Sequence, residues 1–344
     1  MDGAALAERL ADVVGSSVPG VAMIVVDRDG VIATAASGSA DLRDATPASP
    51  SMIAPWFSMT KIVTATTAMR LAERGALDLD EPVAAHVPSV ATLLPAERAR
   101  RITPRHLLSH TAGIANPIPV TWIHPPNVAG PDLDAFLDER LAAHPDLKTE
   151  PGETSSYTNV GTLLLGAAMQ HATSTPFANI VRTEVLEPVG MTRTSFAYPS
   201  DGGAATGYHP KLSPMRFLLP RWVRGPSTRR WMSLHPFLLD GAPYGGLVGP
   251  VEDIAPFLRM HLRDGELDGT RLLGEDATRS MREISHPGKR FDLGLGWFRP
   301  HGDGAGAEGS EPYVEHLGGG AGFWNVMRVC PRAGIGVAVM GNAT

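Results

Sequence analysis

Cysteine, lysine and long apolar runs are all scarce in this chain of 344 residues. The single cysteine, Cys330, excludes an internal disulfide framework, so nothing in the sequence requires an oxidising compartment. No uninterrupted apolar segment approaches the roughly 20 residues that span a membrane. The first 20 residues lack a basic stretch followed by a continuous apolar run, so we see no signal peptide and expect a cytoplasmic protein. A chain trimmed of a leader would look the same.

The chain also lacks a strong charge of one sign. Its net charge of −6 offers no argument for nucleic-acid binding. Apolar residues make up 43% and charged residues 19%, which is typical of a globular protein and not of a disordered one. A chain of this length can bury a large core, as one large domain or two closely packed ones, and we expect a single unit over residues 1–344.

The N-terminal part of the sequence predicts a helix and a β-hairpin. Residues 1–20 have the pattern of an amphipathic helix with Leu6 and Leu10 facing inward. Residues 21–38 contain two β-type runs around the turn sequence at 27–30, which predicts a hairpin.

The middle of the chain has mostly helical patterns, broken by Pro and Gly. A long helix is predicted from residue 59 to about residue 74, with Gly75 suited to its C-terminal cap. Clear helical patterns also occur at 160–172 and 251–265.

Strand patterns return near the C-terminus, at 291–298, 313–318, 323–330 and 334–342. The glycine-rich segment 302–311 between two of these strands is predicted to be a flexible loop.

Strands at both ends with helices between them predict an α+β fold. We expect an antiparallel sheet built from about 1–64 and 286–344, flanked by helices, with an inserted, mostly helical region at about 65–285.

The scarcity of lysine makes one spacing conspicuous. The chain has four lysines against 26 arginines, and Lys61 follows Ser58 by three residues at the predicted start of a helix. Residues i and i+3 share a helix face, so the two side chains should be neighbours. A serine becomes nucleophilic when a base takes its proton, and a lysine can do so only with a pKa lowered from ~10.4 toward ~7–8. With 20 serines, chance produces about 0.2 such pairs, so this spacing alone also fits a surface lysine beside a capping serine.

Two further motifs follow in order. Tyr157 and Asn159 form a Tyr-x-Asn motif, and His316 begins the sequence His-Leu-Gly-Gly that ends with Gly318 and Gly319. This order of motifs resembles the serine β-lactamase and penicillin-binding protein superfamily. Ser-x-x-Lys comes first, Tyr-x-Asn follows, and a basic residue with x-Gly lies on a late strand. The Tyr-x-Asn motif looks like the class C branch, which also contains D-alanyl-D-alanine carboxypeptidases, family VIII carboxylesterases, amidases and acyltransferases.

The resemblance covers nearly the whole chain. Residues 102–114, 186–196, 245–258 and 336–342 are also similar to family segments. The resemblance implies the β-lactamase/transpeptidase fold, an antiparallel sheet flanked by helices beside an all-α region.

The resemblance also implies roles for individual residues. Ser58 would be the acylated nucleophile, and Lys61 and Tyr157 would share the proton transfers; the motifs do not decide which of the two is the base for acylation. Asn159 would hold Lys61 in place and offer its amide to a substrate carbonyl. The backbone N–H groups of Ser58 and Gly319 would form the oxyanion hole, where a glycine allows close approach.

His316 and Gly318 are expected to line the substrate site. His316 stands where class C β-lactamases carry a lysine, and a histidine with an ordinary pKa of ~6.5 is only partly charged at neutral pH. A weaker charge suits a carboxylate-bearing β-lactam less well, which favours an esterase or a peptidase.

Other motif-like features have simpler interpretations. His106 and His110 have a zinc-like i, i+4 spacing, but the metalloprotease Glu is missing, so no metal site is predicted. The glycines at 318–322 lack the context of a phosphate-binding loop, and we expect no cofactor. No Gly-x-Ser-x-Gly elbow occurs, which argues against an α/β-hydrolase.

Residues 209–239 form an unusual basic and aromatic segment with six cations and no acidic residue. Such a segment could be a lid over an acyl pocket, a dimer contact, a weak membrane-surface patch or an ordered variable loop. We hypothesise that it shapes the acyl side of the cleft.

The sequence therefore predicts a serine hydrolase, most simply a carboxylesterase acting on small or medium acyl esters. The alternatives are a D-amino-acid peptidase or amidase, a β-lactamase, an acyltransferase, and a non-catalytic penicillin-binding-like sensor. The expected partner is a small ester or amide, without nucleic acid or a membrane span, and a homo-oligomer is possible.

Overall fold

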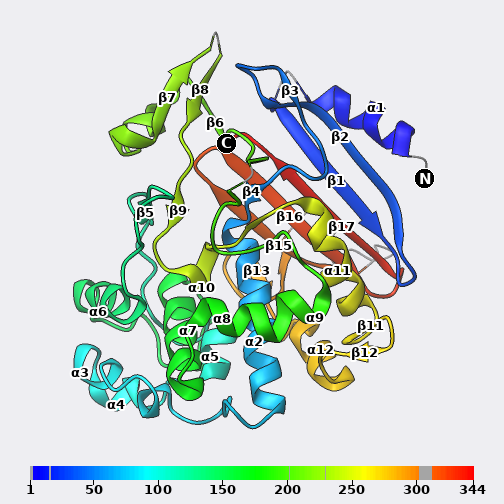
Figure 1. The fold of residues 1–344 in the computed structure, drawn as a ribbon. Helices are drawn as coiled ribbons and strands as arrows, with labels where there is room; N and C mark the ends of the chain where they lie inside the picture. The colour runs from blue at the N-terminus through cyan, green and yellow to red at the C-terminus, as the bar shows by residue number, and fades with distance from the viewer. Residues whose placement is uncertain (1–2, 15–16, 201, 229, 302–311) are drawn as a thin grey trace.

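The structure, a computed structural model, describes residues 3–14, 17–200, 202–228, 230–301 and 312–344 (Figure 1). Its strands are β1 (Gly20–Val26), β2 (Val31–Asp41), β3 (Thr46–Pro47), β4 (Ala54–Pro55), β5 (Ile123–His124), β6 (Tyr208–Pro210), β7 (Arg224–Ser227), β8 (Trp231–Leu234), β9 (Leu238–Leu239), β10 (Val248–Gly249), β11 (Glu266–Leu267), β12 (Thr270–Arg271), β13 (Phe291–Leu293), β14 (Phe298–Pro300), β15 (Val314–Gly320), β16 (Phe323–Cys330) and β17 (Ile335–Gly341). Its α-helices are α1 (Gly3–Val13), α2 (Thr60–Glu73), α3 (Val90–Leu93), α4 (Ala96–Ala99), α5 (Pro104–Leu108), α6 (Leu133–Ala143), α7 (Asn159–Thr173), α8 (Phe177–Val181), α9 (Glu187–Val189), α10 (Ala242–Gly245), α11 (Ile254–Leu262) and α12 (Glu275–Arg282). Short 3-10 turns are η1 (Phe57–Met59), η2 (Val83–Ala85), η4 (Pro214–Phe217), η5 (Arg221–Val223) and η6 (Val251–Asp253), and η3 (Arg182–Leu186) is a π-helical turn.

Both ends of the chain meet in one eight-stranded sheet. Its strand order is β13-β14-β15-β16-β17-β1-β2-β3, and every neighbouring pair is antiparallel. Strand β1 lies between β17 and β2, and six of its seven residues are buried. Its continuous apolar sequence fits a strand that is covered on both faces. The α+β fold expected from the sequence is confirmed.

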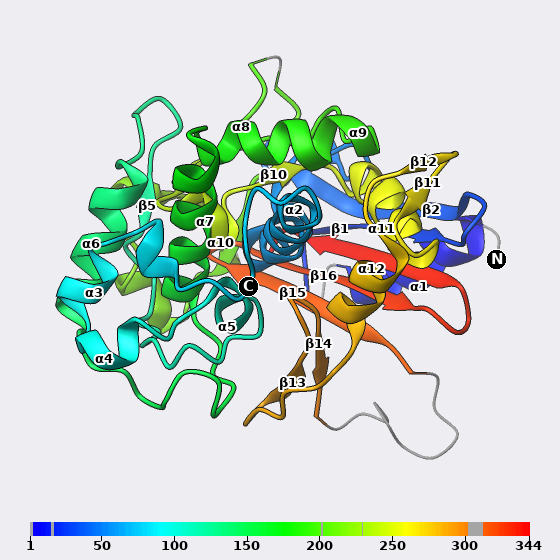
Figure 2. The same ribbon diagram turned by 90° about the horizontal axis from the view of Figure 1, so that it is seen from below.

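Helices cover the two faces of this sheet (Figures 1 and 2). Helix α1 packs on β2, where Leu6 and Leu10 contact Ala33 and Ala35 as expected. Helix α11 packs on β17, β1 and β16, and α2 lies between the sheet and the helices α7 and α8 (Figure 2). Across the described residues, no helix combines the length and apolar character that a membrane crossing requires.

Helix α2 is buried on nearly all sides, although four of its residues are threonines. Thr66 and Thr67 donate their hydroxyls to carbonyl oxygens four residues earlier, and Thr64 donates to Pro243 O at 2.8 Å. These bonds satisfy hydroxyl groups that would otherwise be buried at a cost. Gly75 follows the helix with φ 70°, the left-handed conformation predicted for its C-terminal cap.

The sequence prediction was wrong for the continuous strand at 291–298. The structure splits this segment into β13 and β14, which pair with each other as a hairpin. Gly296 adopts φ 100°, a conformation that interrupts a strand and favours glycine. The predicted flexible loop at 302–311 lies outside the described residues.

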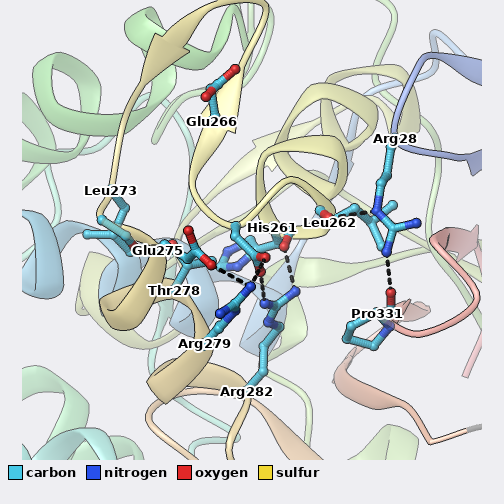
Figure 3. Close-up of polar contacts among 12 residues, drawn as sticks. Arg28, His261, Leu262, Glu266, Leu273, Glu275, Thr278, Arg279, Arg282 and Pro331 are labelled. Atoms are coloured by element: carbon cyan, nitrogen blue, oxygen red, sulfur yellow. Dashed lines mark hydrogen bonds and ion pairs between the residues drawn. The ribbon is translucent and has the colours of Figure 1, made fainter.

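Arginines tie the C-terminus of α11 to its neighbours (Figure 3). Arg28 donates to Leu262 O at 3.3 Å and to Pro331 O at 2.6 Å, and Arg282 donates to His261 O at 2.6 Å. These cations satisfy helix-terminal carbonyls and complement the helix dipole. They fasten α11 to the hairpin turns of the sheet and to α12.

Candidate active site

Ser58 and Lys61 lie at the junction of η1 and α2, with 3.1 Å between Lys61 Nζ and Ser58 Oγ. Lys61 Nζ also lies 2.8 Å from Asn159 Oδ1 and 2.8 Å from the carbonyl oxygen of Tyr244. Both of these oxygens only accept hydrogen bonds. A neutral amine has two hydrogens, so donation to both oxygens directs its lone pair toward the hydroxyl of Ser58.

Lys61 is 3% exposed. Burial penalises the ammonium form and lowers the pKa of Lys61 well below its ordinary value. Burial therefore favours a neutral lysine, and the 3.1 Å separation allows a neutral Lys61 to accept the proton of Ser58.

Tyr157 lies in the segment that leads into α7, and Lys61 Nζ is 4.8 Å from the centroid of its ring. Its ring packs against His110, Phe291 and His316 at centroid distances of 4.7, 5.7 and 6.1 Å. Burial raises the pKa of Tyr157, and a hydrogen bond with Ser58 opposes this shift. Tyr157 thus carries its proton at neutral pH and is not a tyrosinate.

His110 supports the segment that carries Tyr157. Its Nδ1 accepts the backbone N–H of Thr158 at 3.3 Å, and burial lowers its pKa to about 3. His106 is engaged elsewhere, because its Nδ1 accepts the backbone N–H of Thr103 in the capping box that begins α5. The two histidines do not converge, and the described residues contain no group of three potential ligands that could hold a metal ion.

Strand β15 approaches η1 very closely. A Cβ on Gly318 would lie 2.1 Å from Trp56 O, and one on Gly320 would lie 2.2 Å from the ring of Phe57. Side chains at these positions would push the strand away from Ser58. The glycines thus bring β15, including Gly319, against the turn that carries Ser58.

Phe57, immediately before Ser58, has φ 48°, which is unusual for a residue with a side chain. Its ring lies 6.2 Å from that of Phe237 and 6.4 Å from that of Phe323, and these contacts hold it in place. Such local strain persists only where the surrounding packing enforces it, and it often accompanies functional geometry.

His316 is 1% exposed and neutral. Its Nδ1–H donates to Leu317 O at 2.7 Å, whereas its Nε2 is buried without a partner among the described residues. Burial lowers the pKa of His316 well below 6.5. The partial charge expected from the sequence is therefore suppressed by the environment.

Two cavities open on either side of Ser58, and Gly319 also borders both. The first, here called the apolar cavity, has a volume of about 620 Å³. It is lined by Phe57, Ser58, Pro119, Val120, Ile123, Asn159, His209, Pro210, Ser213, Met215, Leu219, Phe237, Leu239, Tyr244, Gly319, Gly320, Ala321 and Thr344. Several of these belong to the segment 209–239 next to Thr344 and η1, so that segment does form one wall of the cleft.

The second, here called the cationic cavity, has a volume of about 740 Å³. Tyr157 and His316 line only this cavity, together with the exposed cations Lys148, Lys289 and Arg290. Of the four lysines in the chain, Lys61 contacts Ser58, and Lys148 and Lys289 line this cavity, which Ser58 also borders.

Sequence reasoning missed two contributors to the site. The carbonyl of Tyr244 accepts from Lys61, and Asn116 Oδ1 accepts the backbone N–H of Asn159 at 2.9 Å. A carbonyl contact leaves no signature in the residue type. Asn116 lies just after the family-like segment 102–114, and this position was its only signal.

Comparison with known proteins agrees with this arrangement. Residues 5–344 match the family model described as Beta-lactamase. The chain belongs to the beta-lactamase family. It is therefore a member of the serine hydrolase superfamily of esterases, DD-peptidases, amidases and β-lactamases.

The similar proteins differ in activity. Penicillin-binding protein 4 of Amycolatopsis lactamdurans is 27% identical over 300 residues, which cover 83% of this chain and 71% of that protein. The D-amino acid amidase of Ochrobactrum anthropi SV3 matches with a TM-score of 0.81 at 24% identity. This match covers 99% of this chain and 91% of the amidase chain. EstCE1, a hydrolase with promiscuous acyltransferase activity, has a TM-score of 0.76 at 22% identity over 99% of this chain and 92% of its own. The last two share the fold, and the family alone does not select a substrate.

Proposed function

We propose that the protein is a carboxylesterase that hydrolyses esters of small and medium apolar acyl groups through an acyl-Ser58 intermediate. The apolar cavity carries this proposal, because none of its lining residues is Lys, Arg, Asp or Glu. An uncharged, mostly apolar cleft of this volume suits an alkyl or aryl acyl group.

Acylation begins with Lys61 as the base. Ser58 Oγ attacks the ester carbonyl while its proton moves to Lys61 Nζ, 3.1 Å away. The backbone N–H groups of Ser58 and Gly319 stabilise the tetrahedral oxyanion. As the C–O bond breaks, Tyr157 protonates the departing alkoxide and regains a proton from Lys61, which leaves alcohol, acyl-Ser58 and a neutral lysine.

Deacylation uses the same groups in reverse. Water takes the place of the alcohol and attacks the acyl carbonyl, while its proton passes through Tyr157 to neutral Lys61. The acyl C–O bond to Ser58 then breaks, and Lys61 returns the proton to Ser58 Oγ as the acid leaves. An alcohol or amine in place of water would make the reaction an acyl transfer with no further residue required.

The lining residues orient the substrate. The leaving group needs a proton, and Tyr157 lines the cationic cavity but not the apolar one. The leaving group therefore lies in the cationic cavity and the acyl group in the apolar cavity.

The cationic cavity also favours a second candidate. Lys148, Lys289 and Arg290 could accept the terminal carboxylate of a leaving amino acid, as in a D-amino-acid peptidase. This activity uses the same acyl-Ser58 chemistry.

A substrate panel tests these proposals. Wild type and Ser58→Ala are assayed with p-nitrophenyl esters from acetyl to decanoyl, a chromogenic cephalosporin and N-acylated D-alanyl-D-alanine. The esterase proposal requires that ester turnover exceeds the other two and disappears in Ser58→Ala. Faster release of D-alanine would establish the peptidase, and faster cephalosporin cleavage a β-lactamase. No turnover and no covalent adduct on Ser58 would indicate a binding protein.

A further inference from the structure

The segment 209–239, here called the basic arm, projects from the body of the protein. Its strands β7 and β8 extend beyond the large sheet at the top of Figure 1. The basic arm has six cations and no acidic residue, although the whole chain has a net charge of −6, so the remaining residues sum to −12. Such charge asymmetry is typical of a surface that meets an anionic partner.

Large apolar side chains are exposed on the same arm. Leu212 is 91% exposed, Phe217 65% and Leu218 55%, and Met215 and Trp222 are also exposed. These five are the majority of the nine exposed large apolar residues among the described residues, and they fall within eleven positions of the chain. This concentration marks an interaction surface and not scattered surface leucines.

Two arginines on this surface, Arg216 and Arg224, donate to backbone carbonyl oxygens of the same segment. Arg216 donates to Lys211 O at 2.6 Å, and its guanidinium lies 4.6 Å from the ring centroid of Phe217. Arg224 donates to Leu219 O at 3.0 Å and to Phe217 O at 3.1 Å. Backbone carbonyls position these guanidinium groups but leave their charge uncompensated.

We propose that the basic arm binds an anionic lipid surface. Exposed Phe, Leu and Trp side chains can enter the interface while Lys and Arg contact negatively charged headgroups. A two-fold contact between two copies through this surface would place like charges against each other, which argues against self-association as its use.

The arm also connects this surface to the apolar cavity. Met215 and Leu219 line that cavity, and the exposed residues Phe217 and Leu218 lie between them in the sequence. A bound lipid surface would therefore lie at the mouth of the apolar cavity. The proposal concerns binding and does not depend on catalysis, so Ser58→Ala should bind vesicles as wild type does.

Vesicle co-sedimentation tests the proposal. The full chain is mixed with vesicles of phosphatidylcholine and phosphatidylglycerol at a 3:1 ratio, or of phosphatidylcholine alone, at 50 and 300 mM salt. Lys211→Gln combined with Arg221→Gln removes two cations, and Arg9→Gln combined with Arg332→Gln removes two exposed cations elsewhere. Phe217→Ser combined with Leu218→Ser removes apolar contact.

The proposal expects binding to the anionic vesicles that weakens with salt and is weak or absent on the neutral ones. At about fivefold per cation, the Lys211 and Arg221 variant should bind about 25-fold more weakly, whereas the Arg9 and Arg332 variant should bind within about twofold of wild type. The Phe217 and Leu218 variant should also lose affinity while its ester hydrolysis in solution is unchanged.

Three results would overturn the proposal. The first is that wild type does not bind anionic vesicles at 50 mM salt. The second is that both charge variants lose the same amount of vesicle affinity. The third is that wild type does not bind vesicles but forms an oligomer that the Phe217→Ser and Leu218→Ser variant no longer forms. The last result would assign the surface to a second copy. A failure of the esterase proposal alone would show as absent turnover with vesicle binding intact.

Discussion

The apolar and the cationic cavity share Ser58 and Gly319 but are lined by side chains of different kinds. One is walled by apolar side chains from segments far apart in the sequence, whereas the other carries three exposed cations together with Tyr157 and the neutral His316. Lys61, which contacts Ser58, is buried, whereas the three cations of the cationic cavity are exposed. We infer that Ser58 and Lys61 determine which reaction takes place and that each cavity binds one part of the substrate.

Replacing Lys61, the proposed base, should have the largest effect and should not distinguish the cavities. In Lys61→Arg the side chain stays protonated, so we expect kcat to fall about 10²–10⁴-fold for every substrate. Steady-state kinetics with several acyl and leaving groups would measure this loss. Retention of activity within tenfold, in a variant that melts near wild type, would instead make Tyr157 the base.

Narrowing the apolar cavity should affect only the acyl side. Leu239→Trp should lower kcat/KM by about fourfold for each acyl methylene that no longer fits, and acetyl esters should be hardly affected. The matched control is Leu212→Trp, because Leu212 is exposed and does not line the cavity. Equal losses for acetyl and decanoyl esters would show that acyl groups do not occupy this cavity.

Removing charge from the cationic cavity should affect only the leaving-group side. Lys289→Gln combined with Arg290→Gln should lower kcat/KM for acyl esters of 4-hydroxybenzoate relative to those of 4-hydroxybenzamide. Both cations are exposed, so the effect should be at most about fivefold per charge. The Arg9 and Arg332 double variant is the control, and an unchanged ratio in the Lys289 and Arg290 variant would contradict the assigned orientation.

Local patterns in the sequence predicted the helix that carries Lys61, the hairpin at its N-terminal side and the three motifs that converge on Ser58. These features depend on residues close together or on motifs with fixed order. The cavities were not predictable in the same way, because the apolar cavity joins positions near 120, 215 and 238 that only the tertiary fold brings together. The carbonyl of Tyr244 escaped notice because any residue could supply it, and Gly296 divided an apolar run that otherwise matched one strand.

The smallest effect is expected in the pH dependence of leaving-group preference. This measurement distinguishes anion binding by His316 from anion binding by Lys289 and Arg290. Burial holds the pKa of His316 well below 6.5, so His316 is neutral from pH 6 to 8 while lysine and arginine remain charged. The ratio of kcat/KM for 4-hydroxybenzoate and 4-hydroxybenzamide esters should therefore vary by less than about twofold over this range. If a protonated His316 bound the carboxylate, raising the pH through about 6.5 would remove the charge and the ratio would fall. The contrary result is a ratio that falls with an apparent pKa near 6.5, in wild type and in the Lys289 and Arg290 variant but not in His316→Gln. That result would assign anion recognition to His316. It would also mean that this side chain is more hydrated than its 1% exposure implies.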